Sequence, residues 1–416
     1  MTDKEHKMTY NEAVEYLYSQ MPMYERQGRT GYKEGLDNTL TLDEHFGHPH
    51  TKYRTIHIAG TNGKGSCANA IAAILQANGK RVGLYTSPHI LDFSERIQVN
   101  GAPVRKDYVV KFIEEERAFF EPMHPSFFEV TTALAFKYFA DEAVEYAVIE
   151  VGLGGRLDCT NIITPILSVI TNISLDHTQL LGNTLVQIAH EKAGIIKNGV
   201  SVVIGESTPE TCPVFEARAR QMNAPITFAR QESADNGDYQ RRNACTISTA
   251  MDVLNKECGL NFEKELSLHS LTRLLGEMNI PCRWQIVSER PKVILDAGHN
   301  AGAWKYIATR LSTIHNLHVI IGFVADKDIE SIASLLPMNA TYYFTKPNSK
   351  RALNEHALAK MAAAHGIKGT CFGNVGMAYE AARTAAAECA TIFVGGSFYL
   401  LSDFLKQPHL HLPHLA

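Results

Sequence analysis

The chain has 416 residues, of which 45% are hydrophobic and 20% are charged, so it is long enough for two domains and too apolar for a disordered protein. Its net charge of −4 gives no electrostatic preference for nucleic acid or an anionic membrane, and no apolar run approaches the ~18 residues of a membrane span. The eight cysteines are scattered singly, and the polar N-terminus lacks the apolar core of a signal peptide. We therefore expect a cytoplasmic protein with reduced thiols, without nucleic-acid or membrane partners.

Strand-like and helix-like patterns alternate through the first two thirds of the chain. Near-continuous apolar runs predict buried strands at Thr55–Ala59, Arg81–Tyr85, Tyr146–Val151, Ile166–Asn172 and Val200–Ile204. Helical patterns lie among them at Lys106–Phe120, Phe128–Ala140 and Thr184–Ile195. This alternation predicts an α/β fold, with a mostly parallel sheet and helices on both of its faces.

A glycine-rich loop with one lysine follows the first predicted strand and precedes an apolar helical stretch: Gly60-Thr61-Asn62-Gly63-Lys64-Gly65-Ser66, then Cys67–Leu75. Glycines let backbone N–H groups approach phosphate oxygens, and the start of a helix favours negative charge. The loop departs from the Walker A pattern, because Ile58 holds the first glycine position and Gly65 separates Lys64 from Ser66. The loop predicts a P-loop-type site for a nucleoside triphosphate, and a plain turn is the alternative.

Polar side chains also follow later strands of the predicted sheet. Glu150 ends one strand, where a carboxylate could hold Mg²⁺ or simply reach solvent. Asp176-His177 follows the next strand, at the sheet edge where open α/β folds bind ligands, and His177 is either a metal or phosphate contact or a satisfied polar residue. Lys192 lies on a predicted helix, where an isolated lysine would be solvated.

A second domain is predicted after a long helical stretch, Tyr239–Cys258, and a polar segment over 261–277. Pro281 stops a helix and marks a hinge, so we divide the chain into domains at 1–282 and 283–416. The second domain is expected to be a smaller, Rossmann-like α/β unit with strands at Lys292–Leu295, His318–Gly322, Ala340–Phe344 and Thr391–Val394. Since Asp296–Asn300 closes the first of these strands, both domains can face one cleft.

A series of short motifs runs through the chain from about residue 9 to residue 405. The motifs are Tyr32–Leu36, Gly60–Ser66, Tyr85–His89, Phe127–Thr132, Glu150–Asp158, Leu175–His177, Glu191–Ile195, Tyr239-Gln240, Arg283-Trp284, Asp296–Asn300, Asp326–Asp328 and Gly395–Ser397. In this order they resemble the folylpolyglutamate synthase/dihydrofolate synthase family of the wider Mur ligase group. Arg156-Leu157-Asp158 resembles the bifunctional bacterial members.

The resemblance implies an ATP-dependent amide ligase. In this family a substrate carboxylate takes the γ-phosphate of ATP and becomes an acyl phosphate, which the amino group of L-glutamate then attacks. The implied acceptors are 7,8-dihydropteroate and the γ-carboxyl group of (tetrahydro)folates. The alternatives are polyglutamylation alone, a Mur ligase acting on a UDP-sugar peptide, and a non-catalytic nucleotide-binding protein. A UDP-sugar ligase is disfavoured because the glycine loop begins near residue 60.

The resemblance also implies roles for individual residues. ATP is implied to contact Thr61, Asn62, Gly63, Lys64, Gly65, Ser66, Arg283, Asp296 and Asn300. The implied catalytic residues are Lys64, His177, Lys192, Asp296 and His299, and Lys192 is expected to be carbamylated. Two Mg²⁺ ions are expected, one on Ser87 and Glu150 and the other on His177. The protein is also expected to bind a potassium ion and to be a monomer.

For the organic substrates, the resemblance assigns His299 and Ser397 to glutamate. The implied pterin and folate contacts are Thr30, Phe128, Thr132, Arg156 and Asp158. The Asp158 carboxylate can accept a pair of hydrogen bonds from an aminopyrimidinone edge, and the alternative is an Asx-type loop cap.

Three features depart from the family pattern. Ala297-Gly298 reverses the usual order of the two residues, which could reshape the turn. Cys282 replaces the glycine expected before Arg283, where the backbone needs conformational freedom. The segment over 228–239 is short for the family.

Overall fold

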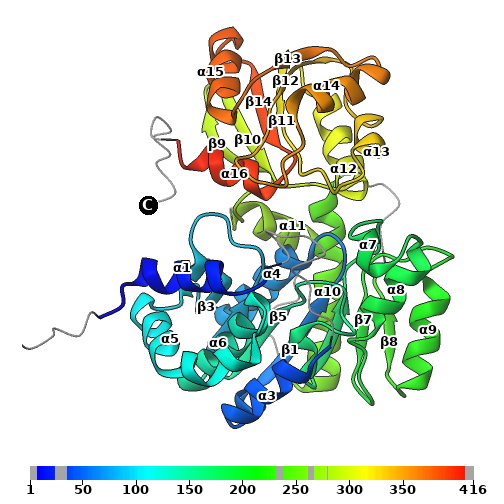
Figure 1. Cartoon of the computed structure of the whole chain (residues 1–416). Coiled ribbons are helices and arrows are strands. Elements are labelled where there is room, and N and C mark those ends of the chain that lie inside the picture. The colour runs from blue at the N-terminus through cyan, green and yellow to red at the C-terminus, as the bar shows by residue number, and fades with distance from the viewer. Residues whose placement is uncertain (1–6, 24–34, 231–237, 261–266, 279, 408–416) are drawn as a thin grey trace, which may run out of the picture.

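The computed structural model describes residues 7–23, 35–230, 238–260, 267–278 and 280–407. The chain forms two α/β units, the first below and the second above in Figure 1. Both halves of the predicted fold are therefore confirmed. None of the described helices has the length and hydropathy needed to cross a membrane.

The first unit is built around an eight-stranded sheet in the order β4-β3-β2-β5-β1-β6-β7-β8. All neighbouring strands pair in parallel except β2 with β3 and β3 with β4. The strands are β1 Arg54–Ala59, β2 Val82–Tyr85, β3 Ile97–Val99, β4 Ala102–Pro103, β5 Tyr146–Glu150, β6 Leu167–Ile170, β7 Val202–Ile204 and β8 Ile226–Phe228.

Helices cover both faces of this sheet, because alternate side chains of a strand point to opposite faces. On β5, Ala147 and Ile149 pack into one core cluster, whereas Tyr146 and Val148 pack into another. The α-helices are α1 Tyr10–Gln20, α3 Asp37–His45, α4 Lys64–Ala77, α5 Lys106–Phe120, α6 Phe127–Asp141, α7 Thr178–Leu181, α8 Leu185–Ala193, α9 Cys212–Gln221, α10 Tyr239–Cys258 and α11 Leu268–Glu277. The 3-10 helices are η2 Pro49–Lys52, η3 Phe93–Arg96, η4 Glu121–Met123 and η5 Cys159–Ile162.

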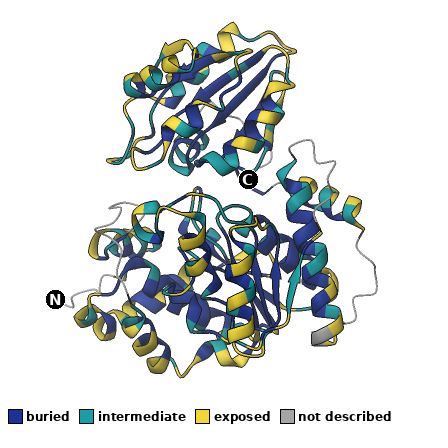
Figure 2. Ribbon diagram, turned by 90° about the vertical axis from the view of Figure 1, so that its right-hand side faces the viewer, coloured by how far each residue is buried: buried dark blue, intermediate teal, exposed yellow. Residues whose placement is uncertain are grey.

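The second unit contains a six-stranded sheet in the order β13-β12-β11-β14-β10-β9, with β9 antiparallel to β10 and the other pairs parallel. Figure 2 shows its dark-blue strands lying between helices with yellow outer faces. The strands are β9 Gln285–Glu289, β10 Lys292–Asp296, β11 Leu317–Ile321, β12 Ala340–Phe344, β13 Gly369–Cys371 and β14 Thr391–Gly395. The helices are α12 Ala301–Ser312, α13 Ile329–Ala333, α14 Glu355–Ala364, α15 Val375–Ala385 and α16 Phe398–Leu405.

The nine predicted strands all occur, with every bound within two residues of the prediction. The interpretation of 261–277 as a polar segment missed helix α11. Ser267 caps this helix, since its side chain accepts a hydrogen bond from the Ser270 N–H group. Leu271 and Leu275 are buried in the core that α11 shares with α4 and α10. Helical spacing of these leucines was the available signal.

Candidate active site

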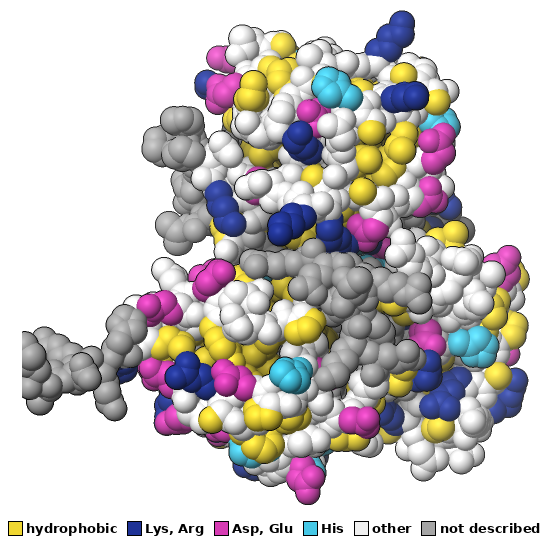
Figure 3. Space-filling view, viewed as in Figure 1, with side chains coloured by type: hydrophobic (Ala, Val, Ile, Leu, Met, Phe, Trp, Pro, Cys, Tyr) yellow, Lys and Arg dark blue, Asp and Glu magenta, His cyan; other side chains and the backbone are white. Residues whose placement is uncertain are grey.

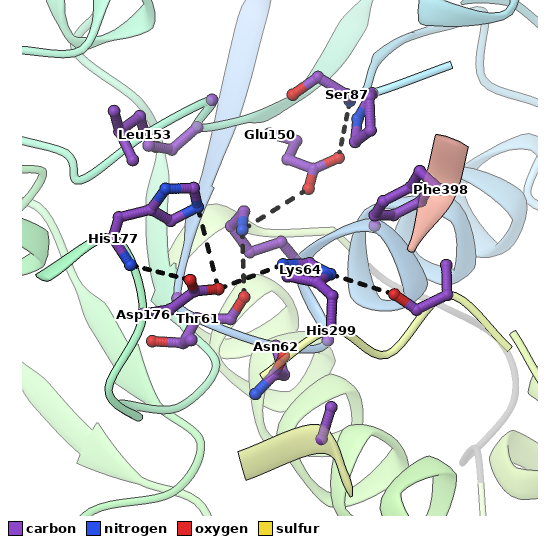
Figure 4. Close-up of a pocket in the computed structure, with 18 of the residues that line it drawn as sticks. Thr61, Asn62, Lys64, Ser87, Glu150, Leu153, Asp176, His177, His299 and Phe398 are labelled. Atoms are coloured by element: carbon purple, nitrogen blue, oxygen red, sulfur yellow. Dashed lines mark hydrogen bonds and ion pairs between the residues drawn. The ribbon is translucent and has the colours of Figure 1, made fainter. Parts of the chain in front are cut away.

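A cleft of about 360 Å³ lies between the two units and is lined by both. The first unit contributes loops that follow β1, β2, β5 and β6, and the second contributes loops that follow β10, β11, β12 and β14. Each set collects at one edge of its sheet because parallel strands end at the same edge. The cleft therefore joins the polar strand ends of both sheets, and Figure 4 shows its central part.

The glycine-rich loop leads from β1 into α4, as predicted. Gly63 has φ 83°, and a side chain there would place its Cβ atom 2.3 Å from Asn243 Oδ1. A Cβ atom on Gly60 would lie 1.8 Å from Thr171 Oγ1. Both positions therefore need glycine. Helix α4 begins at Lys64 beside the cleft, and within the described chain no side chain caps it. Its first N–H groups are consequently well placed for an anion.

Lys64 of this loop lies close to Glu150, which in turn contacts Ser87 (Figure 4). Lys64 Nζ lies 4.0 Å from Glu150 Oε1, and Glu150 Oε2 accepts a hydrogen bond of 3.1 Å from the Ser87 N–H group. Burial raises the pKa of Glu150, although Lys64 and the Ser87 N–H group oppose the shift. The two residues predicted to share a metal ion are thus neighbours beside the phosphate loop.

Asp176 gathers several groups at the middle of the cleft. Its carboxylate forms an ion pair with Lys327, lies 3.2 Å from His299 Nε2, and accepts a hydrogen bond of 2.9 Å from Asn300 Nδ2. Those three residues come from the second unit, whereas His177 Nε2 approaches to 3.9 Å from the first. Burial alone would raise the pKa of Asp176, but the nearby histidines and Lys327 hold it well below its usual range.

The predicted metal ligand His177 has a neutral imidazole. Burial lowers its pKa well below the usual value, and the Asp176 carboxylate opposes this shift without reversing it. Ligand atoms of Asp176, His177 and His299 all lie within 4.8 Å of one another. A neutral imidazole and a carboxylate at this separation can hold a divalent cation.

Two asparagines tie the glycine-rich loop to the second unit. Asn62 Nδ2 donates to Asn300 Oδ1 at 3.1 Å, and Asn300 Nδ2 donates to Asn62 Oδ1 at 3.0 Å. Asn300 Oδ1 also caps α12 by accepting a hydrogen bond from the Ala303 N–H group. One side chain therefore fixes the start of a helix and connects it to the phosphate loop.

Lys192 is buried in the structure, although its place on a helix alone indicated a solvated lysine. Its Nζ atom donates to the Gly60 carbonyl at 2.8 Å, beneath the glycine-rich loop. Burial lowers the pKa of Lys192 to about 7, and the positive charge of Lys64 contributes. The side chain therefore presents a substantial fraction of neutral amine at neutral pH.

Asp296 holds the hinge region in place. Its carboxylate accepts hydrogen bonds from the Tyr239 hydroxyl at 2.8 Å, from the Trp284 N–H at 3.0 Å and from the Gly298 N–H at 2.9 Å. Burial raises the pKa of this carboxyl group, and nearby Arg283 opposes the shift. Arg283 itself lines the cleft, with its guanidinium carbon 4.8 Å from the centre of the Phe398 ring.

The structure describes the sites of two departures from the family pattern. Cys282 has φ 57°, so the backbone does take the left-handed conformation for which glycine is preferred. A Cβ atom on Gly298 would lie 2.3 Å from Ile307 Cδ1 and 3.2 Å from Ala303 Cβ of α12, so a larger residue at this position would require the Ile307 side chain to move. The short segment over 228–239 falls largely outside the described residues.

The predicted folate contacts are only partly brought together. Phe128 and Asp158 line the cleft. Thr132 is buried and lies 3.2 Å from the Tyr85 hydroxyl, and Arg156 forms an ion pair of 3.0 Å with Glu191 on the surface. Neither Thr132 nor Arg156 is among the described residues that line the cleft. Thr30 lies outside the described residues.

Asp158 fits the alternative of a loop cap. Its Oδ1 atom accepts hydrogen bonds from the N–H and hydroxyl groups of Thr160, and its Oδ2 atom accepts one of 2.8 Å from the Leu153 N–H group. A carboxylate offers about four acceptor positions, so these bonds use most of its capacity.

Ser397, the predicted contact of the glutamate substrate, is also a helix cap. It caps α16, and it lines the cleft as well.

Sequence reasoning missed several residues of the cleft. Asp176 was noted beside His177 but given no role, and Lys327 and Arg351 were not selected. Their signal was position: Asp326-Lys327-Asp328 follows the strand β11, and Arg351 follows the strand β12. Polar side chains after parallel strands recur at ligand sites.

Replacing Asp176 by Asn should loosen the contact between the two units. The change leaves the Lys327 ammonium, whose side chain is only 8% exposed, without its counter-charge, and breaking a buried ion pair in this way costs about 3–5 kcal/mol. Small-angle X-ray scattering should show a larger radius of gyration for D176N. D252N, at an exposed position on α10, is the control and should leave the radius unchanged. Equal radii for both variants would contradict this role of Asp176.

Comparisons with known proteins agree with this architecture. The chain matches the Mur ligase middle domain over residues 58–281 and the Mur ligase glutamate ligase domain over residues 282–398. The folylpolyglutamate synthase of Lacticaseibacillus casei is 36% identical over 387 residues, which cover 84% of this chain and 88% of that protein. The dihydrofolate synthase/folylpolyglutamate synthase of Bacillus subtilis strain 168 is 35% identical over 334 residues, 72% of this chain and 77% of that protein.

Similarity to a solved structure extends over nearly the whole chain. The bifunctional folylpolyglutamate synthase/dihydrofolate synthase of Yersinia pestis, complexed with AMPPNP and Mn ion, superposes with a TM-score of 0.79 at 26% identity. The superposition covers 97% of this chain and 99% of that one. The chain therefore belongs to the Mur ligases, as a member of the folylpolyglutamate synthase/dihydrofolate synthase family.

Proposed function

We propose that this chain is an ATP-dependent ligase that joins L-glutamate to 7,8-dihydropteroate and to the γ-carboxyl group of (tetrahydro)folates. The observation that carries the proposal is the meeting of two sites in one cleft. The glycine-rich loop with Lys64 lies on one side, and His299, Asn300 and Lys327 approach it from the second unit. This arrangement suits a reaction that joins two substrates over a nucleotide.

The chain's residues would support the reaction mainly through charge. The acceptor carboxylate attacks the γ-phosphorus, the bond to ADP breaks, and an acyl phosphate forms. The amine of glutamate then attacks the acyl carbon, loses a proton, and releases phosphate. We assign Lys64 and the first N–H groups of α4 to the transferring phosphoryl group. Arg283, Asp296 and His299, which line the cleft, are assigned to closure around ATP, and Asn300 to holding that loop against Asn62.

The donor atoms beside the glycine-rich loop fit Mg²⁺. Ser87 and Glu150 would hold one ion, and His177 would hold a second. The Yersinia pestis relative, which was solved with AMPPNP and Mn ion, supports the use of a nucleotide with a divalent cation. Bound Mg²⁺ would neutralise charge on the phosphates. The potassium ion stays a prediction without assigned ligands.

The proposal also includes the domain bounds, the cellular location and the oligomeric state. We take the domains as 1–282 and 283–416, and the protein as a cytoplasmic monomer. Polyglutamylation alone is the second candidate, because the Lacticaseibacillus casei relative is named folylpolyglutamate synthase. The Bacillus subtilis relative is named dihydrofolate synthase/folylpolyglutamate synthase, which favours both activities in one protein.

ADP release by the purified protein tests the proposal. Mg-ATP and L-glutamate would be supplied with dihydropteroate, with tetrahydrofolate, or without an acceptor. We expect glutamate-dependent release with both acceptors and none without one. Release with tetrahydrofolate alone would leave polyglutamylation only. The absence of ADP release with either acceptor would contradict the proposed function.

Asp158 should matter more for dihydropteroate than for tetrahydrofolate. Dihydropteroate lacks a glutamyl tail, so its binding depends more on contacts with the pterin ring. We expect Asp158→Asn to raise KM for dihydropteroate more than KM for tetrahydrofolate. The control is Thr160→Val, which removes one hydroxyl donor to the Asp158 carboxylate and should affect both acceptors alike. Equal losses in D158N would remove Asp158 from the proposed pterin site.

Lys192 is proposed to react with carbon dioxide and form a carbamate. Its amine nitrogen would bond to the carbon of CO₂ and lose one proton, which requires the neutral amine. With a pKa of about 7, about nine tenths of the Lys192 side chains are neutral at pH 8. Labelled bicarbonate should therefore give a carbamate signal in NMR that is absent from Lys192→Met. The same spectrum for both proteins would contradict carbamylation at this residue.

A further inference from the structure

Arg310, in the last turn of α12, differs from an ordinary surface cation. Figure 3 shows Lys and Arg side chains that project from the surface of the second unit. The guanidinium carbon of Arg310 instead lies 3.8 Å from the centre of the Trp284 ring. At this distance the guanidinium group stacks on the indole, which is the aromatic ring that attracts cations most strongly. Arg310 therefore contacts the hinge region that leads from the first unit into the second.

Two other interactions of Arg310 are weaker. Its Nη1 atom lies 3.9 Å from Asp238 Oδ1, but the two side chains are 30% and 40% exposed, and ion pairs between exposed groups contribute little. A cation in the last turn of a helix is also favoured by the helix dipole, and salt screens this effect at exposed positions. The stack on Trp284 is therefore the strongest of the three interactions.

Trp284 needs such a contact because of its backbone conformation. Cys282 and Trp284 have φ 57° and φ 51°, and a positive φ is unfavourable for residues with side chains, most of all for bulky ones. Backbone of this kind persists only when its surroundings hold it. The Trp284 N–H group donates to Asp296 Oδ2 at 3.0 Å, and the Arg310 guanidinium lies over the indole. The stack with Arg310 therefore helps to hold the hinge backbone in this conformation.

The residue between these two positions is Arg283, which lines the cleft. Cys282 is fully buried and the Trp284 ring packs against the core of the second unit, whereas the Arg283 side chain is left at the cleft. Burial raises the pKa of both Glu150 and Asp296, and the charge of Arg283 is among the groups that oppose these shifts. The Arg283 guanidinium therefore acts on carboxylates of both units, on either side of the proposed nucleotide site.

We propose that Arg310 is a positioning residue for nucleotide binding and that it acts through Arg283. By stacking on Trp284, it fixes the backbone next to Arg283 and keeps the Arg283 guanidinium directed at the nucleotide. This inference rests on the proposed ligase function, in which Arg283 is assigned to closure around ATP. Arg310 is not among the described residues that line the cleft, so its effect on the nucleotide passes through the hinge.

The affinity of the full chain for Mg-ADP, measured by isothermal titration calorimetry, tests the inference without requiring turnover. Arg310→Met removes the cation and keeps an unbranched side chain. We expect the Kd of R310M to be about fivefold higher than that of the wild type, because a stacked cation contributes binding energy of this order. Arg310→Lys, which keeps the charge but loses the planar stack, should recover part of the affinity.

A double-mutant cycle separates positioning from a general effect on the fold. If Arg310 acts through Arg283, Arg283→Met should weaken ADP binding, and adding Arg310→Met should then change the Kd by less than about twofold. Independent contributions would instead multiply, so that R283M/R310M would bind ADP about fivefold more weakly than R283M. That second result would overturn the inference.

Lys305→Met is the matched control, because Lys305 is an exposed cation of the same helix and is not among the described lining residues. It should bind Mg-ADP as the wild type does. Thermal unfolding of each variant separates binding effects from misfolding. An unchanged Kd in folded R310M, or equal increases in R310M and K305M, would also overturn the inference. A wild-type protein that does not bind Mg-ADP would instead contradict the proposed function.

Discussion

The buried carboxylate of Asp176 is the contact on which the cleft depends. It belongs to the first unit, and Lys327, His299 and Asn300 reach it from the second. A buried carboxylate is stable only when charges and hydrogen bonds replace its lost hydration. Here most of those groups come from the other unit. The same contact places His299 beside His177 and Asn300 beside the glycine-rich loop, so docking the units also assembles the proposed site.

Burial shifts the pKa values of the titratable groups around this contact. It lowers the pKa of Lys192 and His177, and it raises the pKa of Glu150 and Asp296. Electrostatic interactions among such buried groups are stronger than those between groups at the surface. A phosphate group or metal ion entering between these residues would compensate charges that the protein already holds. This property suits phosphoryl transfer, in which negative charge must be stabilised without reorganising the site.

The sequence predicted features whose signal is local. The strand, glycine-rich loop and helix around Lys64 form a continuous segment. Glu150 ends one strand and His177 follows another, and any parallel sheet would bring these strand ends to one edge. Burial of Lys192 could not be predicted, because its partner is the Gly60 carbonyl 132 positions away. The Lys327–Asp176 pair spans 151 positions and depends on how the two units dock. Asp158 was ambiguous, since the same carboxylate can cap a loop and face a pocket.

The central claim is that an acyl phosphate forms in the cleft between the two units. The most direct test supplies dihydropteroate whose carboxyl group is labelled with heavy oxygen, together with ATP and L-glutamate. If the carboxylate takes the γ-phosphate, one labelled oxygen must leave with the phosphate when the amide forms. Mass spectrometry should therefore find the label in the released phosphate in proportion to product. Product formation with unlabelled phosphate would contradict the account.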